Sequence, residues 1–204
     1  MAELKNLFVT RLYRAELALK KLQREIHEAC LITAEADVAG QRWSAANNYP
    51  GYTSYASLND LPWRYPCFAD LAAELDKHAL AFSRKLEWDL QDRPLTLDSL
   101  WINVLPPGGY HASHIHPLSV ISGTYYVAVP KGAAALKLED PRSARMMAAP
   151  PRKKTAKPDH QPFIYETPKA GSLLMWESWL RHEVPMNHAK SDRISVSFNY
   201  RWGD

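Results

Sequence analysis

Three histidines and one arginine in the second half of the chain are the residues whose types and spacing could do chemistry. His114 and His116 lie two positions apart, and His182 and Arg193 follow in later segments that also have the composition of strands. Side chains two positions apart on an extended strand point to the same face, so the first two imidazoles can bind the same ion. Three imidazoles can hold a divalent metal with positions left open for a substrate or for O₂. An arginine supplies a permanently charged fork that suits a carboxylate, so the pattern predicts a metal beside an anion site.

The segment around the arginine is expected to be a strand with one polar face. Arg193, Ser195, Ser197 and Asn199 alternate with four apolar residues, which are Ile194, Val196, Phe198 and Tyr200. Because side chains alternate along a strand, the polar set would look into a barrel and the apolar set would pack outside it. A polar inward face is unusual for a purely structural strand but suits a ligand site.

The elements that would position these residues form a helical first part and a strand-rich second part. Apolar residues recur at helical spacing from about residue 15 to 33 and again over 68–86, and residues 7–10 have the composition of a short strand. Residues 40–66 are rich in Asn, Ser, Tyr, Gly and Pro and are expected to form an irregular connection. From about residue 97 onward we expect about eight short strands. The prediction is a mainly β, α+β protein: a barrel or jelly roll braced by two helices.

We expect one domain over residues 1–204, in which 1–96 support a β core formed by 97–204. One segment of that core stands apart, a loop at 141–162. It holds six basic residues and no acidic one between positions 142 and 157. A mobile, solvated loop is the simpler interpretation. The alternative is a basic lid over the barrel mouth that attracts an acidic substrate.

Composition and charge argue against several classes of protein. A net charge of +3 is too small to indicate nucleic-acid binding, and the basic loop has no aromatic residues between its charges. No apolar run approaches the ~20 residues of a membrane span, and the N-terminus lacks a secretory pattern. Cys30 and Cys67 predict buried free thiols rather than a disulfide framework. We therefore expect a cytoplasmic protein that binds neither a membrane nor nucleic acid.

Four segments carry a more specific signal. They are His114-Ile115-His116-Pro117, Ser122-Gly123-Thr124-Tyr125-Tyr126-Val127, Ser178-Trp179-Leu180-Arg181-His182-Glu183-Val184 and Arg193-Ile194-Ser195-Val196-Ser197-Phe198-Asn199. Together they resemble the Fe(II)- and 2-oxoglutarate-dependent oxygenase superfamily, and most closely a bacterial and phage subgroup of it. The similarity covers roughly residues 97–202. The resemblance implies a double-stranded β-helix, which is a cupin-like jelly roll.

The resemblance also implies a role for each position. His114 and His182 would be metal ligands, and His116 stands where the wider superfamily carries a carboxylate. Arg193, with Ser195, would hold the distal carboxylate of 2-oxoglutarate. Further residues would contact the co-substrate (Asn103 and Tyr126) or lie around the metal and substrate (His111, Ser197, Asn199 and Trp176). The implied cofactors are Fe(II), 2-oxoglutarate and O₂. The implied activity is a dioxygenase that couples oxidative decarboxylation of 2-oxoglutarate to hydroxylation of a substrate.

His116 is the main departure from the superfamily pattern. A neutral imidazole leaves the iron site one unit more positive than a carboxylate would, and a dianionic co-substrate would still bind favourably. Two alternatives stay open: a three-His cupin-type enzyme that does not use 2-oxoglutarate, and a non-catalytic barrel that binds a ligand. The substrate would be a small molecule or a side chain. Exposed Trp and Tyr within residues 40–66 would suit a homodimer face.

Overall fold

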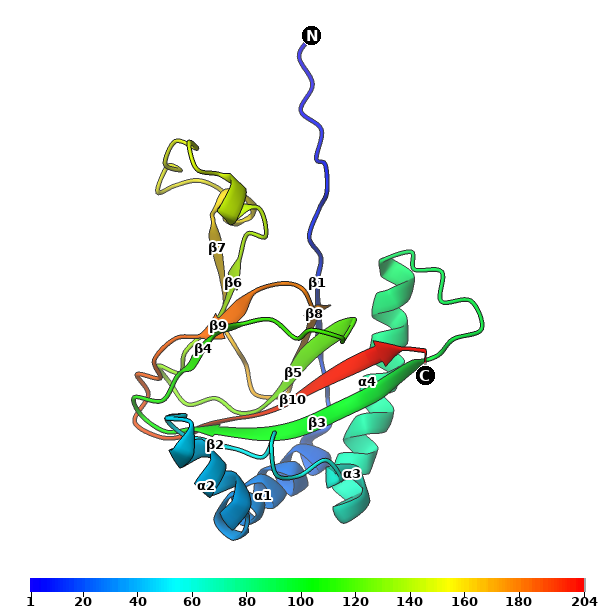
Figure 1. Cartoon of the computed structure of the whole chain (residues 1–204), viewed down its shortest axis with the longest axis vertical. Helices are drawn as coiled ribbons and strands as arrows, with labels where there is room; N and C mark the ends of the chain where they lie inside the picture. The colour runs from blue at the N-terminus through cyan, green and yellow to red at the C-terminus, as the bar shows by residue number, and fades with distance from the viewer. Residues whose placement is uncertain (204) are drawn as a thin grey trace.

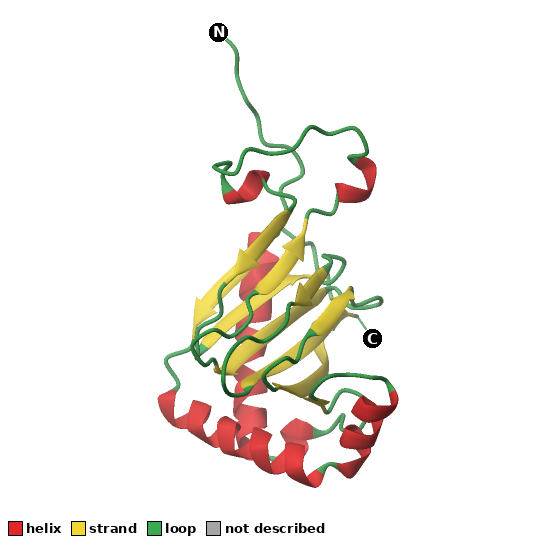
Figure 2. Cartoon of the chain, turned by 90° about the vertical axis from the view of Figure 1, so that its left-hand side faces the viewer, coloured by secondary structure: helices red, strands yellow, loops and turns green. Residues whose placement is uncertain are grey.

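Two antiparallel β-sheets face each other, and helices cover the outer face of the larger sheet (Figures 1 and 2). The structure, a computed structural model, describes residues 1–203. The strands are β1 (Leu12–Glu16), β2 (Tyr52–Thr53), β3 (Leu95–Leu105), β4 (His111–His114), β5 (Ile121–Ala128), β6 (Leu136–Glu139), β7 (Phe163–Glu166), β8 (Ser172–Glu177), β9 (His182–Val184) and β10 (Arg193–Trp202). The larger sheet has the order β1-β8-β5-β10-β3-β2, and the smaller one has the order β4-β9-β6-β7. The fold is the double-stranded β-helix that the family resemblance implied.

Strand β10 lies inside the larger sheet and separates two environments. It pairs antiparallel with β3 and β5, which places Ser195 opposite both Asn103 and Tyr126. Its apolar side chains pack in the core between sheet and helices; they are Ile194, Val196, Phe198 and Tyr200. Arg193 and Ser195 point the other way, into a cavity between the two sheets. The predicted alternation of this strand is confirmed.

Two long helices, α1 (Lys20–Ala36) and α4 (Pro66–Lys85), form the outer layer. Each turns a stripe of apolar side chains toward the sheet, as an amphipathic surface helix must. The buried apolar residues are Ile26, Ala29 and Cys30 in α1, and Cys67, Phe68, Leu71, Leu75, Ala79 and Phe82 in α4. Both cysteines are free and buried, as predicted. Among the helices of residues 1–203, none is long and apolar enough to cross a membrane.

The first part of the chain differs from the sequence prediction in three places. The opening strand is β1, not residues 7–10, and the register that defines it pairs Leu12 with Trp176 of β8. The first helix begins at Lys20 rather than near residue 15. Residues 40–66 contain most of α2 (Val38–Ala46) and all of α3 (Leu61–Arg64), so the described residues form four α-helices instead of two. Asp37 caps α2 by accepting a hydrogen bond from the Gly40 N–H, a local signal that the prediction overlooked.

Phe198→Ala is expected to lower the free energy of unfolding by about 3–5 kcal/mol, the usual cost of a large cavity in a core. Phe198 is fully buried, and a methyl group added at Gly123 would lie only 2.3 Å from its ring, so the surroundings are closely packed. Urea unfolding measures the change as a lower midpoint at unchanged slope. Leu31→Ala on the half-exposed face of α1 is the control, with an expected loss below about 1 kcal/mol. Equal midpoint shifts for the two variants would contradict this account of the core.

Candidate metal centre and co-substrate pocket

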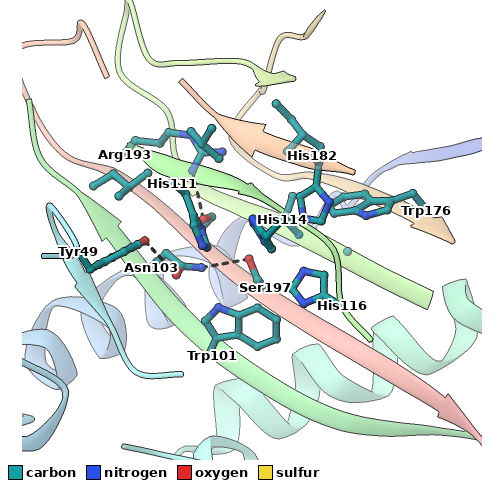
Figure 3. Close-up of a pocket in the computed structure, with 16 residues that line it drawn as sticks. Tyr49, Trp101, Asn103, His111, His114, His116, Trp176, His182, Arg193 and Ser197 are labelled. Carbon is teal, nitrogen blue, oxygen red and sulfur yellow. Dashed lines mark hydrogen bonds between the residues drawn. The ribbon is translucent and has the colours of Figure 1, made fainter. Parts of the chain in front are cut away.

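Strands β4 and β9 bring three histidines together. His114 lies opposite His182 in the ladder between these strands, and His116 follows just beyond the end of β4. A register shift between His111 and His114 bends β4, so that both of these side chains enter the same cavity (Figure 3). Nitrogen atoms of His114, His116 and His182 all lie within 4.8 Å of one another. A divalent ion with Zn- or Fe-like bonds of ~2.0–2.2 Å can reach all three after small side-chain movements.

The three imidazoles are held neutral, which is the state in which histidine coordinates a metal. Burial, with added repulsion from His114, lowers the pKa of His182 to about 2 and that of His116 to about 4. Burial also lowers the pKa of His114. The Nδ1 atoms of His114 and His182 lie 2.7 Å from the Ala112 carbonyl and 2.9 Å from the Leu180 carbonyl. Because a carbonyl can only accept, each Nδ1–H donates, and each Nε2 keeps its lone pair for a metal.

Arg193 is a buried cation without a counter-ion in the described part of the chain. Only 2% of the residue is exposed. One terminal nitrogen donates to the Ser195 hydroxyl at 3.3 Å, and the guanidinium carbon lies 5.0 Å from the centre of the Tyr126 ring. The Nε atom has no hydrogen-bond partner within residues 1–203. An unpaired buried charge is costly, so an anion bound at this position would be strongly favoured.

One cavity connects the histidines with Arg193 (Figure 3). It contains about 450 Å³ of empty space, open solvent included. Besides those four residues, the predicted residues that line it are Asn103, His111, Trp176, Ser195 and Ser197. None of the described residues on its wall is acidic. A divalent metal and a guanidinium in such a cavity attract a dianion that can reach both.

Two predicted residues lie beside the cavity rather than on its wall. Tyr126 is fully buried with its ring against the Arg193 guanidinium. Asn199 accepts a hydrogen bond from the Ser122 hydroxyl at 2.8 Å and donates one to the Ser99 hydroxyl at 3.2 Å. Tyr126 therefore supports the arginine from behind, and Asn199 joins β10 to its neighbours β5 and β3.

Tyr49 belongs to the cavity wall although the sequence analysis did not single it out. Its hydroxyl donates to Asn103 at 3.5 Å, and its ring meets His111 edge-on at 5.3 Å between centroids. Strand β2, which follows Tyr49, pairs with β3 so that Thr53 lies opposite Asn103. This pairing places the segment that contains Tyr49 beside the cavity. The other unpredicted lining residues are Trp101, Leu105, Gly123, Thr124, Leu136 and Val184. No periodic pattern marks Tyr49, and a tyrosine directly before a Pro-Gly turn is the only local signal.

The three histidine nitrogens fit Fe(II), which accepts imidazole ligands. They supply no carboxylate to the ion. Nearby acidic residues have other partners: Glu183 pairs with Lys137 at 2.8 Å, and Asp140 pairs with Arg142 at 2.8 Å. Glu177 is not on the cavity wall. The negative charge that a divalent ion needs must therefore come from a bound ligand.

Comparison with known proteins assigns the family. Residues 99–199 match the protein-family model described as "Putative 2OG-Fe(II) oxygenase", and this region contains all three histidines and Arg193. The chain belongs to the 2OG-Fe(II) oxygenases, enzymes that use Fe(II), 2-oxoglutarate and O₂. Among curated protein sequences, none matches the chain.

Solved structures share the fold at low sequence identity. The non-heme α-ketoglutarate-dependent carbocyclase SnoK from nogalamycin biosynthesis has a TM-score of 0.65 and 14% identity, over 94% of this chain and 79% of its own. HygX from Streptomyces hygroscopicus, with nickel, 2-oxoglutarate and hygromycin B bound, has a TM-score of 0.61 and 15% identity, over 94% and 83%. A Pseudomonas putida prolyl-4-hydroxylase has a TM-score of 0.55 and 16% identity, over 94% and 93%. At these identities the similarity establishes the fold alone.

Proposed function

We propose that His114, His116 and His182 hold Fe(II), and that Arg193 holds the distal carboxylate of 2-oxoglutarate. The observation that carries this proposal is one cavity that joins three neutral imidazoles to a buried guanidinium without a counter-ion. 2-Oxoglutarate has a keto-acid end that suits the metal and a second carboxylate that suits the arginine fork. A dianion would balance the positive charges of the metal ion and of the Arg193 guanidinium at the same time.

Each part of this co-substrate pocket would have its own task. Iron with 2-oxoglutarate supplies the oxidising chemistry, in which O₂ is consumed while 2-oxoglutarate is converted to succinate and CO₂. Arg193 would orient the distal carboxylate, with the Ser195 hydroxyl as a second donor. The Tyr126 ring would keep the guanidinium from turning away, because it closes the space behind it.

The remaining wall would set the shape of the pocket and exclude water. Asn103 is held between the Tyr49 hydroxyl and Ser197, to which it donates at 3.1 Å, so its amide has a fixed direction. The centroids of the Trp176 and His182 rings lie 4.7 Å apart, so the Trp176 ring would keep water from one side of that histidine. A dry site strengthens each electrostatic contact within it.

The second substrate would be a small molecule or a side chain, and hydroxylation is the outcome that we propose. A single domain over residues 1–204, a cytoplasmic location and the absence of a nucleic-acid partner stay predictions. A homodimer through residues 40–66 also stays a prediction. Tyr55 is 56% exposed there and Trp63 is 86% exposed. A monomeric mass in solution at high protein concentration would count against the dimer.

The test adds Fe(II) and then 2-oxoglutarate to metal-free protein under anaerobic conditions. The proposal predicts the weak visible charge-transfer band of the iron–keto acid chelate and, after O₂ is admitted, formation of succinate. Iron binding without the band would favour the three-His enzyme that does not use 2-oxoglutarate. Absence of metal binding would overturn the catalytic proposal.

His116 can be tested separately as a ligand. His116→Ala is expected to weaken Fe(II) binding by about 10–100-fold or more, since the loss of even a supporting residue of a metal site costs that much. His116→Asp should restore most of the affinity, because a carboxylate at this position can also ligate. Titration with Fe(II) under anaerobic conditions measures both. Wild-type affinity in the alanine variant would show that His116 does not bind the metal.

A further inference from the structure

A basic arm, residues 141–162, projects beyond β6 and β7, away from the helical layer (Figures 1 and 2). Its base is closed by a hydrogen bond from the Asp140 N–H to the Pro162 carbonyl at 2.8 Å. Two short 3₁₀ turns, Ser143–Arg145 and Pro158–His160, give it local structure. Hydrogen bonds such as that from the Gln161 amide to the Lys153 carbonyl connect one part of the arm to another. The arm therefore extends into solvent from a fixed base.

The arm carries a concentrated positive charge. Its six basic residues stand against one acidic residue, Asp159, so the arm has a net charge of +5 while the whole chain has +3. The rest of the chain is accordingly net negative. Arg142 is neutralised by Asp140, which it contacts at 2.8 Å. The other five cations are exposed and make no ion pair within residues 1–203; they are Arg145, Arg152, Lys153, Lys154 and Lys157.

The base of the arm lies directly beside the proposed metal centre. Leu138 of β6 is paired with His182, and the next residue, Glu139, donates its backbone N–H to the Arg181 carbonyl at 3.0 Å. The arm begins two residues further on. A chain bound along the arm would therefore pass close to the metal ligands.

Exposed apolar residues lie on two loops near the same ligands. Ile115 and Leu118 are on the loop that contains His116, and Trp179 is on the turn that precedes His182. Backbone hydrogen bonds from His116 N–H to the Ser178 carbonyl and from Ser178 N–H to the Val120 carbonyl, both 3.1 Å, join these two loops. Leu118 is 99% exposed and has a φ of +70°, an unfavourable backbone conformation for a leucine. An exposed apolar residue this close to the metal ligands offers a contact surface to a binding partner.

We propose that the basic arm docks an acidic polypeptide segment, and that an apolar residue of this segment packs on Leu118 and Trp179 while a neighbouring side chain enters the cavity. This inference rests on the proposed function and specifies its substrate class. The cavity between the sheets would already hold the metal and 2-oxoglutarate, so the substrate part that enters it is a side chain rather than a second whole molecule. Five unpaired cations supply the complementary charge.

The composition of the arm favours a polypeptide over nucleic acid. Residues 141–162 contain no Phe, Tyr or Trp, the side chains on which bases most often stack, and stacking is the usual second component of single-strand binding. They do contain Met146 and the almost fully exposed Met147. Methionine side chains adapt to varied peptide surfaces.

The test measures binding of a fluorescent glutamate-rich peptide with a central leucine by fluorescence anisotropy at two salt concentrations. The full-length protein is compared with the triple variant Arg152→Gln, Lys153→Gln, Lys154→Gln. The variant is expected to bind the peptide about tenfold more weakly, with a smaller salt dependence, since it lacks three of the five unpaired cations of the arm. A matched control replaces three exposed cations at the start of α1, Lys20, Lys21 and Arg24, with Gln and should bind like the wild type.

Several results would overturn the docking proposal. They are no binding, an equal loss in the α1 control, equal binding of a peptide with Gln in place of Glu, or tighter binding of a single-stranded oligonucleotide of the same charge. The anaerobic band with Fe(II) and 2-oxoglutarate, measured on the same samples, separates the two proposals. An arm-dependent peptide affinity without the band would support the docking surface and overturn the proposed function. The band without peptide binding would do the reverse.

Discussion

His182→Ala is expected to abolish stable Fe(II) binding and, with it, formation of succinate from 2-oxoglutarate. His182 is only 5% exposed, its Nδ1–H donates to the Leu180 carbonyl, and one nitrogen of its ring lies within 4.8 Å of nitrogens of His114 and His116. Removing one of three protein ligands should weaken metal binding by at least about 100-fold, the upper range for loss of a merely supporting residue. Metal content after gel filtration and anaerobic Fe(II) titration measure the effect.

Two further variants distinguish the loss of a metal ligand from a loss of structure. His182→Gln keeps most of the side-chain volume next to Trp176 and should lose the metal as the alanine variant does. His188→Ala removes an exposed histidine outside the cavity and should bind Fe(II) like the wild type. Full metal occupancy in a folded His182→Gln variant would exclude this residue as a ligand.

Arg193→Met is expected to remove 2-oxoglutarate binding while Fe(II) binding persists. Loss of one partner of a buried charge pair costs about 2–5 kcal/mol, which corresponds to a dissociation constant higher by roughly 30-fold or more. In the wild type, 2-oxoglutarate at about 100 times its dissociation constant should add ~2.7 kcal/mol to the free energy of unfolding. The variant should gain almost nothing at the same concentration. Thermal unfolding of the Fe(II)-loaded protein, with and without 2-oxoglutarate under anaerobic conditions, measures the difference.

The unliganded protein provides a further readout for Arg193. Its guanidinium has no counter-ion in the described residues, so an apolar replacement of similar length should leave the stability of this form unchanged or raise it. Arg193→Lys keeps the charge but lacks the planar fork and should bind 2-oxoglutarate with intermediate affinity. If the Met variant binds 2-oxoglutarate like the wild type, the anion site lies elsewhere.

Much of the β core and the main candidate ligands could be predicted from local patterns. The alternation of polar and apolar residues from Arg193 to Tyr200 is a period-2 signal, and one strand face in contact with a core makes such a signal unambiguous. The spacing of His114 and His116 also predicted two neighbouring imidazoles, although His116 lies just beyond the end of β4 and not on the strand itself. The stripes of α1 and α4 were visible as helical periodicity. Each of these inferences depends on the geometry of a single element.

What the sequence left open depends on contacts between distant segments. Tyr49 reaches the cavity because β2 pairs with β3, and the residues around Tyr49 in the sequence do not predict that pairing. His111 shares a face with His114 only because of the register shift in β4. Asn199 lies on the same face of β10 as Arg193 and Ser195. Its side-chain amide is nevertheless hydrogen-bonded to Ser122 and Ser99 of the neighbouring strands and does not line the cavity.

The sequence by itself therefore singled out the three candidate metal ligands, the arginine and the faces on which strand residues lie. Only the tertiary structure decided which inward residues reach the cavity, that Arg193 is buried without a counter-ion, and that the basic arm begins beside His182. The physical reason is that side-chain direction follows from local backbone periodicity. Register, bulges and burial arise when strands far apart in the chain pack together.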